Sequence, residues 1–541
     1  MLFNVRFWRK FSLLKHSFEQ EYFMIYDLLV IGGGINGAGI ARDAAGRGLS
    51  VLLCEKDDLA QHTSSASTKL IHGGLRYLEH YEFSLVRKSL KEREILLRSA
   101  PHIIGPLRFI MPHAPEQRPT WLIRAGLFLY DHLAKREILP GSESIKLGQH
   151  LTGEPLKKGF KQGFAYSDAW VQDARLVVLN ALDARERSAH ILTQTEVIAA
   201  RREGQYWHVS LKNSDGEIED VIAKGVVNAA GPWVDNILGQ VTQTGSAHKM
   251  RLVKGSHIIV KRLFDHPYAY IFQNPDKRII FAIPYENDFT LIGTTDVEYQ
   301  GDPGEVTIDH AEVEYLCQMS NRYFEQQIMP SDVIATMSGV RPLFNDEANS
   351  AASVTRDYSL ELCFENNAAP LVSIFGGKLT SYRKLAEEAI DLIAPHLGNK
   401  QGRWTEGECL PGGDIPNMDM SHFIQLCQER YPWIPATIIV RYAKSYGTRL
   451  HQLIGSAKSL DQLGIEIAPT LFEAEVMYLI NVEWAKTAQD IIWRRSKLQL
   501  HLQDSDIAKL EDWLAVHFSS AAALTNNLAW STSLTTGEVS I

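Results

Sequence analysis

Short apolar runs alternate with small-residue and polar segments along the chain, and this pattern predicts its first elements. Residues 27–31 and Val51–Cys54 are apolar runs of strand length, and the small residues 38–46 between them have helical character. Leu371–Phe375 is a similar run, followed by two glycines and a helical segment to about Ala394. Apolar runs bounded by glycine and followed by helices are typical of buried strands in an α/β fold.

The turn after the first run has glycines at a spacing that suits a phosphate. In Gly32-Gly-Gly-Ile-Asn-Gly37 the first glycine permits a tight turn, the second admits a pyrophosphate, and the third lets helix pack on strand. Glu55 ends the second run, near the ~20-residue distance at which an acid takes ribose hydroxyls. The order strand, glycines, helix, strand and acid predicts dinucleotide binding.

A hydroxyl-rich segment, residues 63–81, follows and can be interpreted in two ways. Its Ser and Thr hydroxyls and glycine backbone could line a pyrophosphate, while Lys69 and Arg76 could meet anions. It could equally be a polar surface loop that leads into the helix after Phe83. Composition does not separate the two.

The middle of the chain has a different pattern. Residues 257–260, 268–272, 278–283 and 289–292 are apolar or aromatic runs separated by turn residues, which predicts an antiparallel sheet. Beyond residue 400 the pattern is helical, most clearly at 472–484 and 491–500. The tail from about Ser519 is rich in Ser, Thr, Ala and Asn, and we expect it to be disordered.

Composition and charge restrict the possible partners. The formal net charge of −9 argues against a general nucleic-acid partner, and the five scattered cysteines lack metal-ligand spacing, so we expect reduced thiols and no metal site. No apolar run approaches the ~20 residues that span a bilayer, so any membrane contact must be peripheral. Residues 118–136 mix bulky apolar side chains with cations, which suits either an interfacial helix or an ordinary packed one.

Residues 1–23 form a basic, aromatic N-terminal extension. Since Met24 lies directly before the first strand, we favour a mis-set start codon or an accessory extension over a dedicated membrane anchor.

Several sequence blocks resemble one enzyme family. They are Ile31-Gly-Gly-Gly-Ile-Asn-Gly-Ala-Gly-Ile40, Thr63-Ser-Ser-Ala-Ser67, Lys69-Leu-Ile-His-Gly-Gly-Leu-Arg-Tyr-Leu-Glu79, Asp173-Ala-Arg-Leu176, Asn228-Ala-Ala-Gly-Pro-Trp233, Lys254-Gly-Ser-His257, Gly293-Thr-Thr-Asp296, Ser338-Gly-Val-Arg-Pro342 and Phe375-Gly-Gly-Lys-Leu-Thr380. Together they resemble the FAD-dependent glycerol-3-phosphate dehydrogenases of aerobic respiration, within the amino-acid-oxidase-like flavoprotein superfamily. The block around His72 to Tyr77 is specific to that family.

The resemblance implies an α/β fold with a discontinuous Rossmann-like FAD-binding domain, an antiparallel-sheet substrate domain and a C-terminal all-helical domain. We expect the FAD-binding domain at 24–100, 170–240 and 350–395, and the substrate domain at 101–169 and 241–349. The helical domain should occupy 400–518 and the disordered tail 519–541. The helical domain could brace the substrate domain or mediate self-association as a homodimer.

The resemblance also implies the site residues. Non-covalent FAD would be held by Gly32, Gly34, Asn36, Gly37, Glu55, Thr63, Ser64, Ser65, Ser67, Lys69, His72, Gly73, Gly74, Leu75, Val197, Ala230, Gly231, Arg341, Gly377, Lys378, Leu379 and Thr380. The substrate, sn-glycerol 3-phosphate, would contact Arg76, Tyr77, His257, Arg341, Arg356 and Lys378, with His257, Arg341 and Lys378 as catalytic residues. His257 could be the general base or only a hydrogen-bonding residue. Lys378 could stabilise charge on the flavin or bind substrate.

The implied reaction is oxidation to dihydroxyacetone phosphate, with electrons passed to a membrane quinone at the cytoplasmic face of the inner membrane. An oxidase that uses O₂ remains an alternative because oxygen reactivity depends on details of the cavity. An amine oxidase would need a carboxylate site without phosphate selectivity, which the arginines argue against. A non-catalytic module in RNA modification conflicts with the acidic balance.

Overall fold

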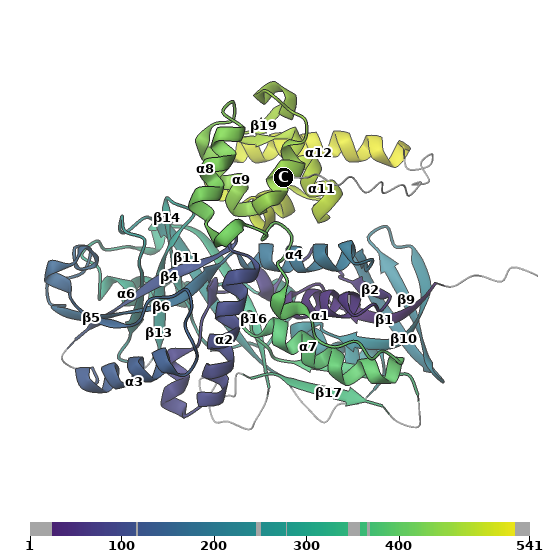
Figure 1. Ribbon diagram of the computed structural model, residues 1–541, viewed down its shortest axis with the longest axis horizontal. Helices are drawn as coiled ribbons and strands as arrows, with labels where there is room; N and C mark the ends of the chain where they lie inside the picture. The colour runs from purple at the N-terminus through teal and green to yellow at the C-terminus, as the bar shows by residue number, and fades with distance from the viewer. Residues whose placement is uncertain are drawn as a thin grey trace, which may run out of the picture.

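The computed structural model describes residues 24–114, 117–244, 250–276, 278–344, 357–364 and 368–524. The N-terminal extension, Arg356 and residues 525–541 therefore lie outside the described residues. Figure 1 shows two sheet-based parts side by side, with the green and yellow C-terminal domain lying across them.

The first sheet is built from segments far apart in the chain, as predicted for the discontinuous FAD-binding domain. Its central strands β18, β10, β1, β2 and β7 are parallel neighbours in that order. The strands of this sheet are β1 (Ile25–Ile31), β2 (Val51–Cys54), β7 (His190–Leu192), β8 (Thr195–Glu203), β9 (Tyr206–Asn213), β10 (Ile218–Asn228), β17 (Ser359–Cys363) and β18 (Leu371–Phe375). Helices α1 (Ile35–Gly46), α4 (Asp173–Glu186) and α7 (Tyr382–Ile393) share an apolar core with one face of the sheet. The predicted strand–glycine–helix units are therefore confirmed at both β1 and β18.

The second sheet is mainly antiparallel and contains all four of the predicted middle runs. Its order is β15-β11-β14-β13-β12-β4-β6-β3, with β16 added to β11 and β5 to β6. The strands are β3 (Leu70–Ile71), β4 (Ile104–His113), β5 (Glu143–Lys146), β6 (Gln162–Val171), β11 (Met250–Lys261), β12 (Ala269–Gln273), β13 (Ile279–Tyr285), β14 (Phe289–Gly293), β15 (Val297–Glu298) and β16 (Val333–Phe344). Helices α2 (Phe83–Ser99), α3 (Thr120–His132) and α6 (His310–Asn321) surround it. The short helix α5 (Val234–Asn236) comes after β10 of the first sheet in the chain.

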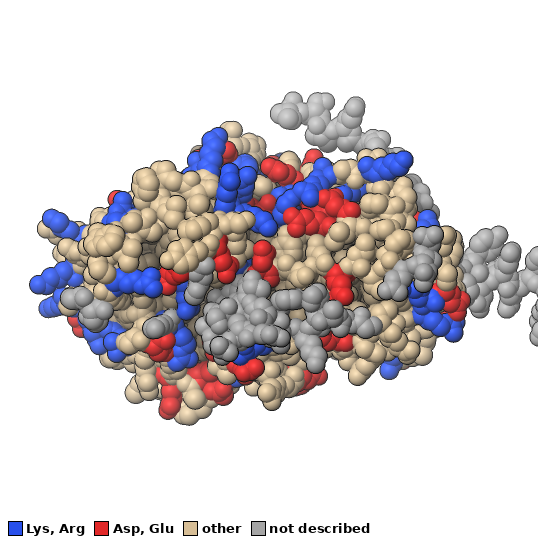
Figure 2. All heavy atoms as spheres, turned by 90° about the horizontal axis from the view of Figure 1, so that it is seen from below, with Lys and Arg blue, Asp and Glu red and all other residues tan. Residues whose placement is uncertain are grey.

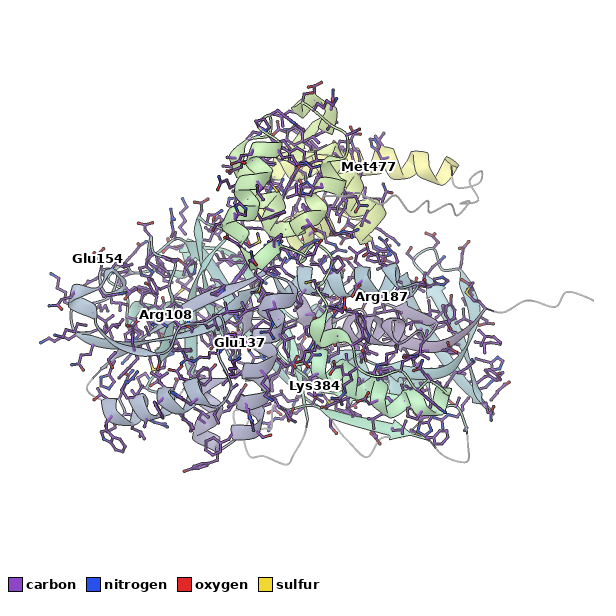
Figure 3. The ribbon with its side chains drawn as sticks, in the orientation of Figure 1. Arg108, Glu137, Glu154, Arg187, Lys384 and Met477 are labelled. Atoms are coloured by element: carbon purple, nitrogen blue, oxygen red, sulfur yellow. The ribbon has the colours of Figure 1, made fainter. Side chains whose placement is uncertain are left out.

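The C-terminal domain has its own apolar core. Its helices are α8 (Met420–Arg430), α9 (Ala436–Tyr446), α10 (Leu450–Ile454), α11 (Glu473–Glu483) and α12 (Asp504–Leu524). Figure 3 shows Met477, on α11, well above the two sheets.

The C-terminal domain is helical, as predicted, with one short antiparallel pair, β19 (Glu466–Ala468) and β20 (Leu471–Phe472), beside its helices. Two finer expectations about this domain need correction. The helix expected at 491–500 is instead a π-helical turn, Asp490–Arg495, and a 3₁₀ turn, Leu498–His501, because Lys497 takes a left-handed conformation with φ of 62°. Helix α12 continues into the expected disordered tail as far as Leu524, through an Ala-rich stretch with high helix propensity.

Candidate functional site

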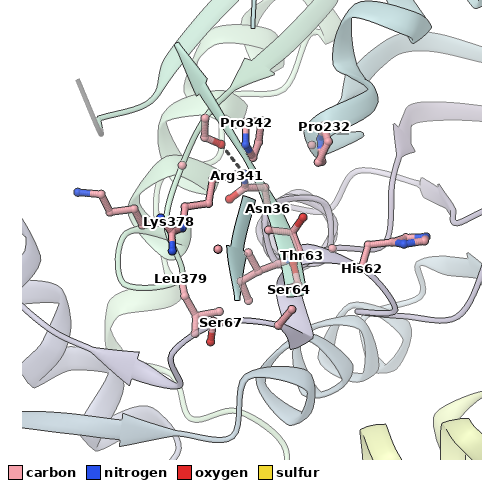
Figure 4. Close-up of a pocket in the computed structure, with 18 of the residues that line it drawn as sticks. Asn36, His62, Thr63, Ser64, Ser67, Pro232, Arg341, Pro342, Lys378 and Leu379 are labelled. Carbon is pink, nitrogen blue, oxygen red and sulfur yellow. Dashed lines mark hydrogen bonds between the residues drawn. The ribbon is translucent and has the colours of Figure 1, made fainter. Parts of the chain in front are cut away.

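A cavity of about 450 Å³ lies where the two sheets meet. The carboxyl ends of β1, β2, β10 and β18 open onto it through Gly32, Glu55, Ala229 and Gly376. Ligands of open α/β sheets bind outside the carboxyl ends of parallel strands. Its opposite wall comes from β11, β16 and the segment after β14. Figure 4 shows Asn36, Ser64, Arg341 and Lys378, which come from distant segments, around one space.

The glycine turn after β1 has the close approaches that its spacing predicts. Gly32 has φ of 108°, and a Cβ there would lie 2.6 Å from the carbonyl oxygen of Ala229. A Cβ on Gly37 would lie 1.9 Å from the carbonyl oxygen of Gly32, so only glycine allows this packing of α1. Gly34 is the N-cap of α1 and lines the cavity, which leaves the helix N-terminus open to an anion.

Glu55 joins the end of β2 to this turn. Its Oε2 accepts a hydrogen bond of 2.6 Å from the backbone N–H of Gly33, and its Oε1 accepts one of 2.9 Å from Asp57. Burial raises the pKa of Glu55, although these two N–H donors and the nearby His62 oppose the shift. The carboxyl group lines the cavity at the position where the motif expects ribose contacts.

The hydroxyl-rich segment forms a cavity wall, not a surface loop. The backbone N–H of Ile35 donates to Ser64 Oγ at 3.0 Å, and Thr63 Oγ1 donates to the carbonyl oxygen of Val340 at 2.7 Å. Ser67 Oγ donates to Asp173 at 2.7 Å. The segment therefore links α1, β16 and α4 around the cavity.

Most predicted cofactor residues line the cavity. They are Gly32, Gly34, Asn36, Glu55, Thr63, Ser64, Ser67, His72, Gly74, Leu75, Val197, Ala230, Gly231, Arg341, Gly377, Lys378, Leu379 and Thr380. The predicted substrate residues Arg76, Tyr77 and His257 line it too. Their contacts with FAD or substrate stay a prediction.

Four predicted cofactor residues do not line the cavity: Gly37, Ser65, Lys69 and Gly73. The Lys69 side chain is 1 % exposed, and its Nζ donates to Asp173 at 2.8 Å and to the carbonyl oxygen of Ser65 at 3.1 Å. Ser65 Oγ bonds within its own turn, and the backbone N–H of Gly73 donates to the Tyr130 hydroxyl. Gly37 lies behind the turn. These residues support the wall from behind.

His257 lies on β11 where the strand passes Gly293 of β14. A Cβ on Gly293 would lie 2.1 Å from the imidazole, so the ring occupies the space this glycine leaves. Nε2 is 3.0 Å from Thr68 Oγ1, and Nδ1 has no hydrogen-bond partner among the described residues. Burial, followed by the nearby Arg341 and Lys69 cations, lowers the pKa of His257 to about 3. The imidazole is therefore neutral near pH 7.

Arg341 lies on β16, opposite Val253 of β11, and its guanidinium is held from two sides. Nη1 is ion-paired with Asp296, and Nη2 donates to Thr294 Oγ1 at 2.7 Å. A Cβ on Gly255 would lie 2.3 Å from Nη2, so this glycine makes room for the side chain. The Arg341 side chain is 30 % exposed, which leaves part of its surface open to the cavity.

Lys378 follows the Gly376-Gly377 turn after β18. Its Nζ lies 4.2 Å from the centroid of the Tyr77 ring and has no hydrogen-bond partner among the described residues. The Asn36 amide donates to the carbonyl oxygen of Gly376 at 3.2 Å, while its Oδ1 is also unpaired. Buried polar atoms without partners are unusual and suit an absent ligand.

Several cavity residues were missed by the sequence reasoning. Thr68 and Asp296 bond to His257 and Arg341, and both adjoin or belong to the blocks that carry the resemblance. Asp296 ends the Gly293-Thr-Thr-Asp296 block, so its place in the motif was a usable signal. Tyr166 and Asp168 on β6 also line the cavity, but no local pattern marks them.

Comparison with known proteins identifies the family. A family model described as FAD dependent oxidoreductase matches residues 27–383, and one described as the C-terminal domain of alpha-glycerophosphate oxidase matches residues 403–518. A glycerol-3-phosphate dehydrogenase of Pseudomonas aeruginosa is 52 % identical over 491 residues, which cover 91 % of this chain and 95 % of that protein. The chain belongs to the FAD-dependent glycerol-3-phosphate dehydrogenase family. An aerobic glycerol-3-phosphate dehydrogenase of Escherichia coli is 48 % identical, over 92 % of this chain and 99 % of that protein. A D-erythritol 1-phosphate dehydrogenase of Brucella abortus is 50 % identical over 90 % of this chain and 97 % of its own.

Solved structures agree with this family. A glycerol-3-phosphate dehydrogenase from Bacillus halodurans, complexed with FAD, superposes with a TM-score of 0.75 and 28 % identity, over 94 % of this chain and 93 % of that one. L-alpha-glycerophosphate oxidase from Mycoplasma pneumoniae has a TM-score of 0.57 at 17 % identity over 72 % of this chain and 99 % of that one, which shows the shared fold.

FAD is the cofactor of this family, and the cavity fits it. The open N-terminus of α1, the buried Glu55 carboxyl group and the unpaired Asn36 Oδ1 and Lys378 Nζ line one continuous space. Their donors and acceptors match phosphate, ribose and a polar ring edge. The residues present therefore suit a flavin dinucleotide.

Proposed function

We propose that this chain oxidises sn-glycerol 3-phosphate to dihydroxyacetone phosphate and passes the electrons to a membrane quinone. The observation that carries the proposal is the single cavity shared by the glycine turn at Gly32–Gly34 and the polar group of Arg341, His257 and Lys378. A cofactor held at the first group would meet a small anion held at the second.

Arg341 is the proposed phosphate ligand. Asp296 and Thr294 fix one side of its guanidinium, and the exposed remainder can donate to phosphate oxygens. Charge-assisted bonds of this kind contribute roughly 1.5–3 kcal/mol each. The unpaired Nζ of Lys378 supplies a second cation. Arg76 lines the same cavity, and Arg356 stays a predicted ligand outside the described residues.

His257 is the proposed acceptor of the proton from the substrate hydroxyl. If Nε2–H donates to Thr68 Oγ1, the unpaired Nδ1 keeps its lone pair. A neutral imidazole with one free nitrogen is the form a base requires. FAD, when bound, supplies the acceptor for the hydride that leaves carbon 2.

The test is anaerobic stopped-flow absorbance of the FAD-loaded protein, mixed with glycerol 3-phosphate and then with a soluble quinone. Flavin bleaching with fast recovery on quinone and slow recovery in air supports the proposal. Fast recovery in air would support the oxidase instead. No bleaching would refute the substrate. D-erythritol 1-phosphate, the substrate named for one relative, shares the phosphate and alcohol groups and should be compared by kcat/KM.

We further propose that the protein binds the cytoplasmic face of the inner membrane peripherally, through α3. No helix among the described residues is long and apolar enough to cross a bilayer. Helix α3 exposes Trp121, Leu122, Phe128 and Leu129, whereas Leu127 is buried. Arg118, Arg124, Lys135 and Arg136 lie in or beside α3 in the chain. Figure 2, seen from below, shows Lys and Arg side chains distributed over this face, including its left edge. Apolar side chains flanked by cations suit an anionic interface.

The exposed residues define the test of membrane binding. Serine at Trp121, Leu122, Phe128 and Leu129 should weaken binding to anionic liposomes while flavin content and melting temperature are kept. Replacing Leu127 would instead disturb the core, since its side chain packs among buried residues such as Leu90 and Phe109. A folded fourfold variant that still binds liposomes like the wild type would exclude α3 as the contact.

A further inference from the structure

The C-terminal domain reaches the nucleotide end of the cavity through two arginines. Arg495, whose side chain is 0 % exposed, donates from Nη1 and Nη2 to the two carboxylate oxygens of Asp58, each at 2.7 Å. Arg494 Nε donates to Oδ2 of the same carboxylate at 2.6 Å. Asp58 follows β2 and is itself 3 % exposed. A bidentate pair of this kind is both strong and geometrically specific.

Asp58 lies in a loop, residues 55–62, that forms part of the cavity wall. Glu55, Lys56, Ala60, Gln61 and His62 all line the cavity. The loop turns back on the glycine motif, because the backbone N–H of Ala60 donates to the Gly33 carbonyl oxygen at 3.2 Å.

The loop also contains a strained position. Ala60 has φ of 63°, a left-handed conformation that costs a non-glycine residue free energy, so the loop needs support from its surroundings. Within the loop, only Asp58 and the adjoining Asp57 carboxylate carry negative charge besides Glu55. Asp58 is the one that the C-terminal arginines bind.

The arginines are themselves fixed by their own domain. Arg495 Nη2 also donates to the carbonyl oxygen of Glu483 at 2.8 Å, and Arg494 is ion-paired with Asp490. We call the contact of Arg494 and Arg495 with Asp58 the Asp58 clamp. Through this clamp the position of the C-terminal domain determines the position of the loop at the cavity.

We propose that Arg494 and Arg495 are positioning residues that hold loop 55–62 in the shape that binds FAD, so that the C-terminal domain completes the cofactor site. This inference rests on the proposed placement of FAD at the glycine turn. Neither arginine lines the cavity, so their effect is on cofactor affinity and not on the chemical step. Losing the clamp lowers the fraction of molecules whose loop is competent to bind.

The experiment uses the full chain, stripped of FAD and titrated with FAD while flavin fluorescence is followed. R495M should raise the dissociation constant for FAD about tenfold. R494Q, which leaves both Arg495 bonds in place, should raise it less. The loss of activity in both variants should be recovered by excess FAD, with KM for glycerol 3-phosphate unchanged.

R449M is the matched control. Arg449, in the C-terminal domain, donates to Glu186 of α4 at 2.7 Å and to the Tyr478 hydroxyl at 3.0 Å. This change therefore removes an arginine between the same two parts without removing a partner of Arg495 or of the loop. It should lower the melting temperature and leave the FAD dissociation constant at the wild-type value.

Two outcomes would overturn the inference. One is wild-type FAD affinity in both R494Q and folded R495M, and the other is an equal loss of affinity in R449M. If R495M does not fold, the affinity of R494Q decides. G34V tests the placement of FAD separately, and wild-type affinity in that variant would refute the placement itself. Failure of glycerol 3-phosphate to bleach wild-type flavin would refute only the proposed substrate.

Discussion

The buried neutral state of His257 predicts a measurable dependence of stability on pH. Its pKa falls from an ordinary 6.5 to about 3, because of burial and then the Arg341 and Lys69 charges. In the unfolded chain this histidine therefore binds a proton as the pH falls below about 6.5, whereas in the folded protein it stays neutral until about pH 3. The stabilisation is complete above pH 6.5 and is lost as the pH falls toward 3. Linkage gives a loss of about 2 kcal/mol between pH 7 and pH 5 from this residue alone.

The assay compares wild type with H257Q by urea-induced unfolding across that range. Because glutamine does not titrate, the wild type should lose about 2 kcal/mol more unfolding free energy than the variant. His102 provides a matched control, since burial and then Arg175 also lower its pKa to about 3, and it does not line the cavity. H102Q should show the same difference in pH dependence.

Kinetics separate the two histidines. If His257 is the base, H257Q should lower kcat by about 10²–10⁴-fold, whereas H102Q should not. Parallel pH dependence of unfolding in wild type and H257Q would refute the buried neutral imidazole. If wild type and H257Q differ by the expected amount in the pH dependence of unfolding, but kcat falls less than about tenfold, His257 is a hydrogen-bonding residue and its role as base is refuted.

Three further substitutions test the rest of the site. R341K keeps the charge but loses the planar fork, so steady-state KM for glycerol 3-phosphate should rise about tenfold, and an unchanged KM would exclude Arg341 as the phosphate ligand. D296N leaves an acceptor for Arg341 but removes the charge that neutralises it, so KM should fall about threefold, and a rise would contradict this electrostatic argument. K69M breaks the buried pair with Asp173 and should cost about 3–5 kcal/mol of unfolding free energy while folded protein keeps its FAD. Loss of FAD without loss of stability would instead support the prediction that Lys69 is a cofactor ligand.

The glycine turn after β1 was predictable because its determinants are local. Gly32 and Gly37 must be glycine for steric reasons that act within a few residues or across one parallel strand pair, and the spacing of the motif carries that information. The strand runs were predictable for the same reason, since alternation and turn residues are properties of short windows. Helix α12 extends beyond residue 518, its expected end. The Ser- and Ala-rich composition after that residue suggested disorder, whereas its alanines favour helix.

Lys69 shows what a local pattern does not contain. It stands inside a block that suits FAD binding, and its partner Asp173 lies 104 residues away and holds the charge in the interior. The Asp58 clamp spans 437 residues and was equally invisible. A charged side chain in a motif has the same appearance in sequence whether it faces the cavity or a distant carboxylate.

Such distant ion pairs also explain how a discontinuous domain assembles in one way. Arg383 of α7 binds Glu92 of α2 across 291 residues, and Arg42 of α1 binds Asp183 of α4 across 141, all with buried side chains. Apolar helix faces would tolerate many relative positions, whereas an unpaired buried charge is costly, so each pair excludes misaligned packings. The Asp58 clamp follows the same rule, and it extends the rule from the assembly of the fold to the shape of the cofactor site.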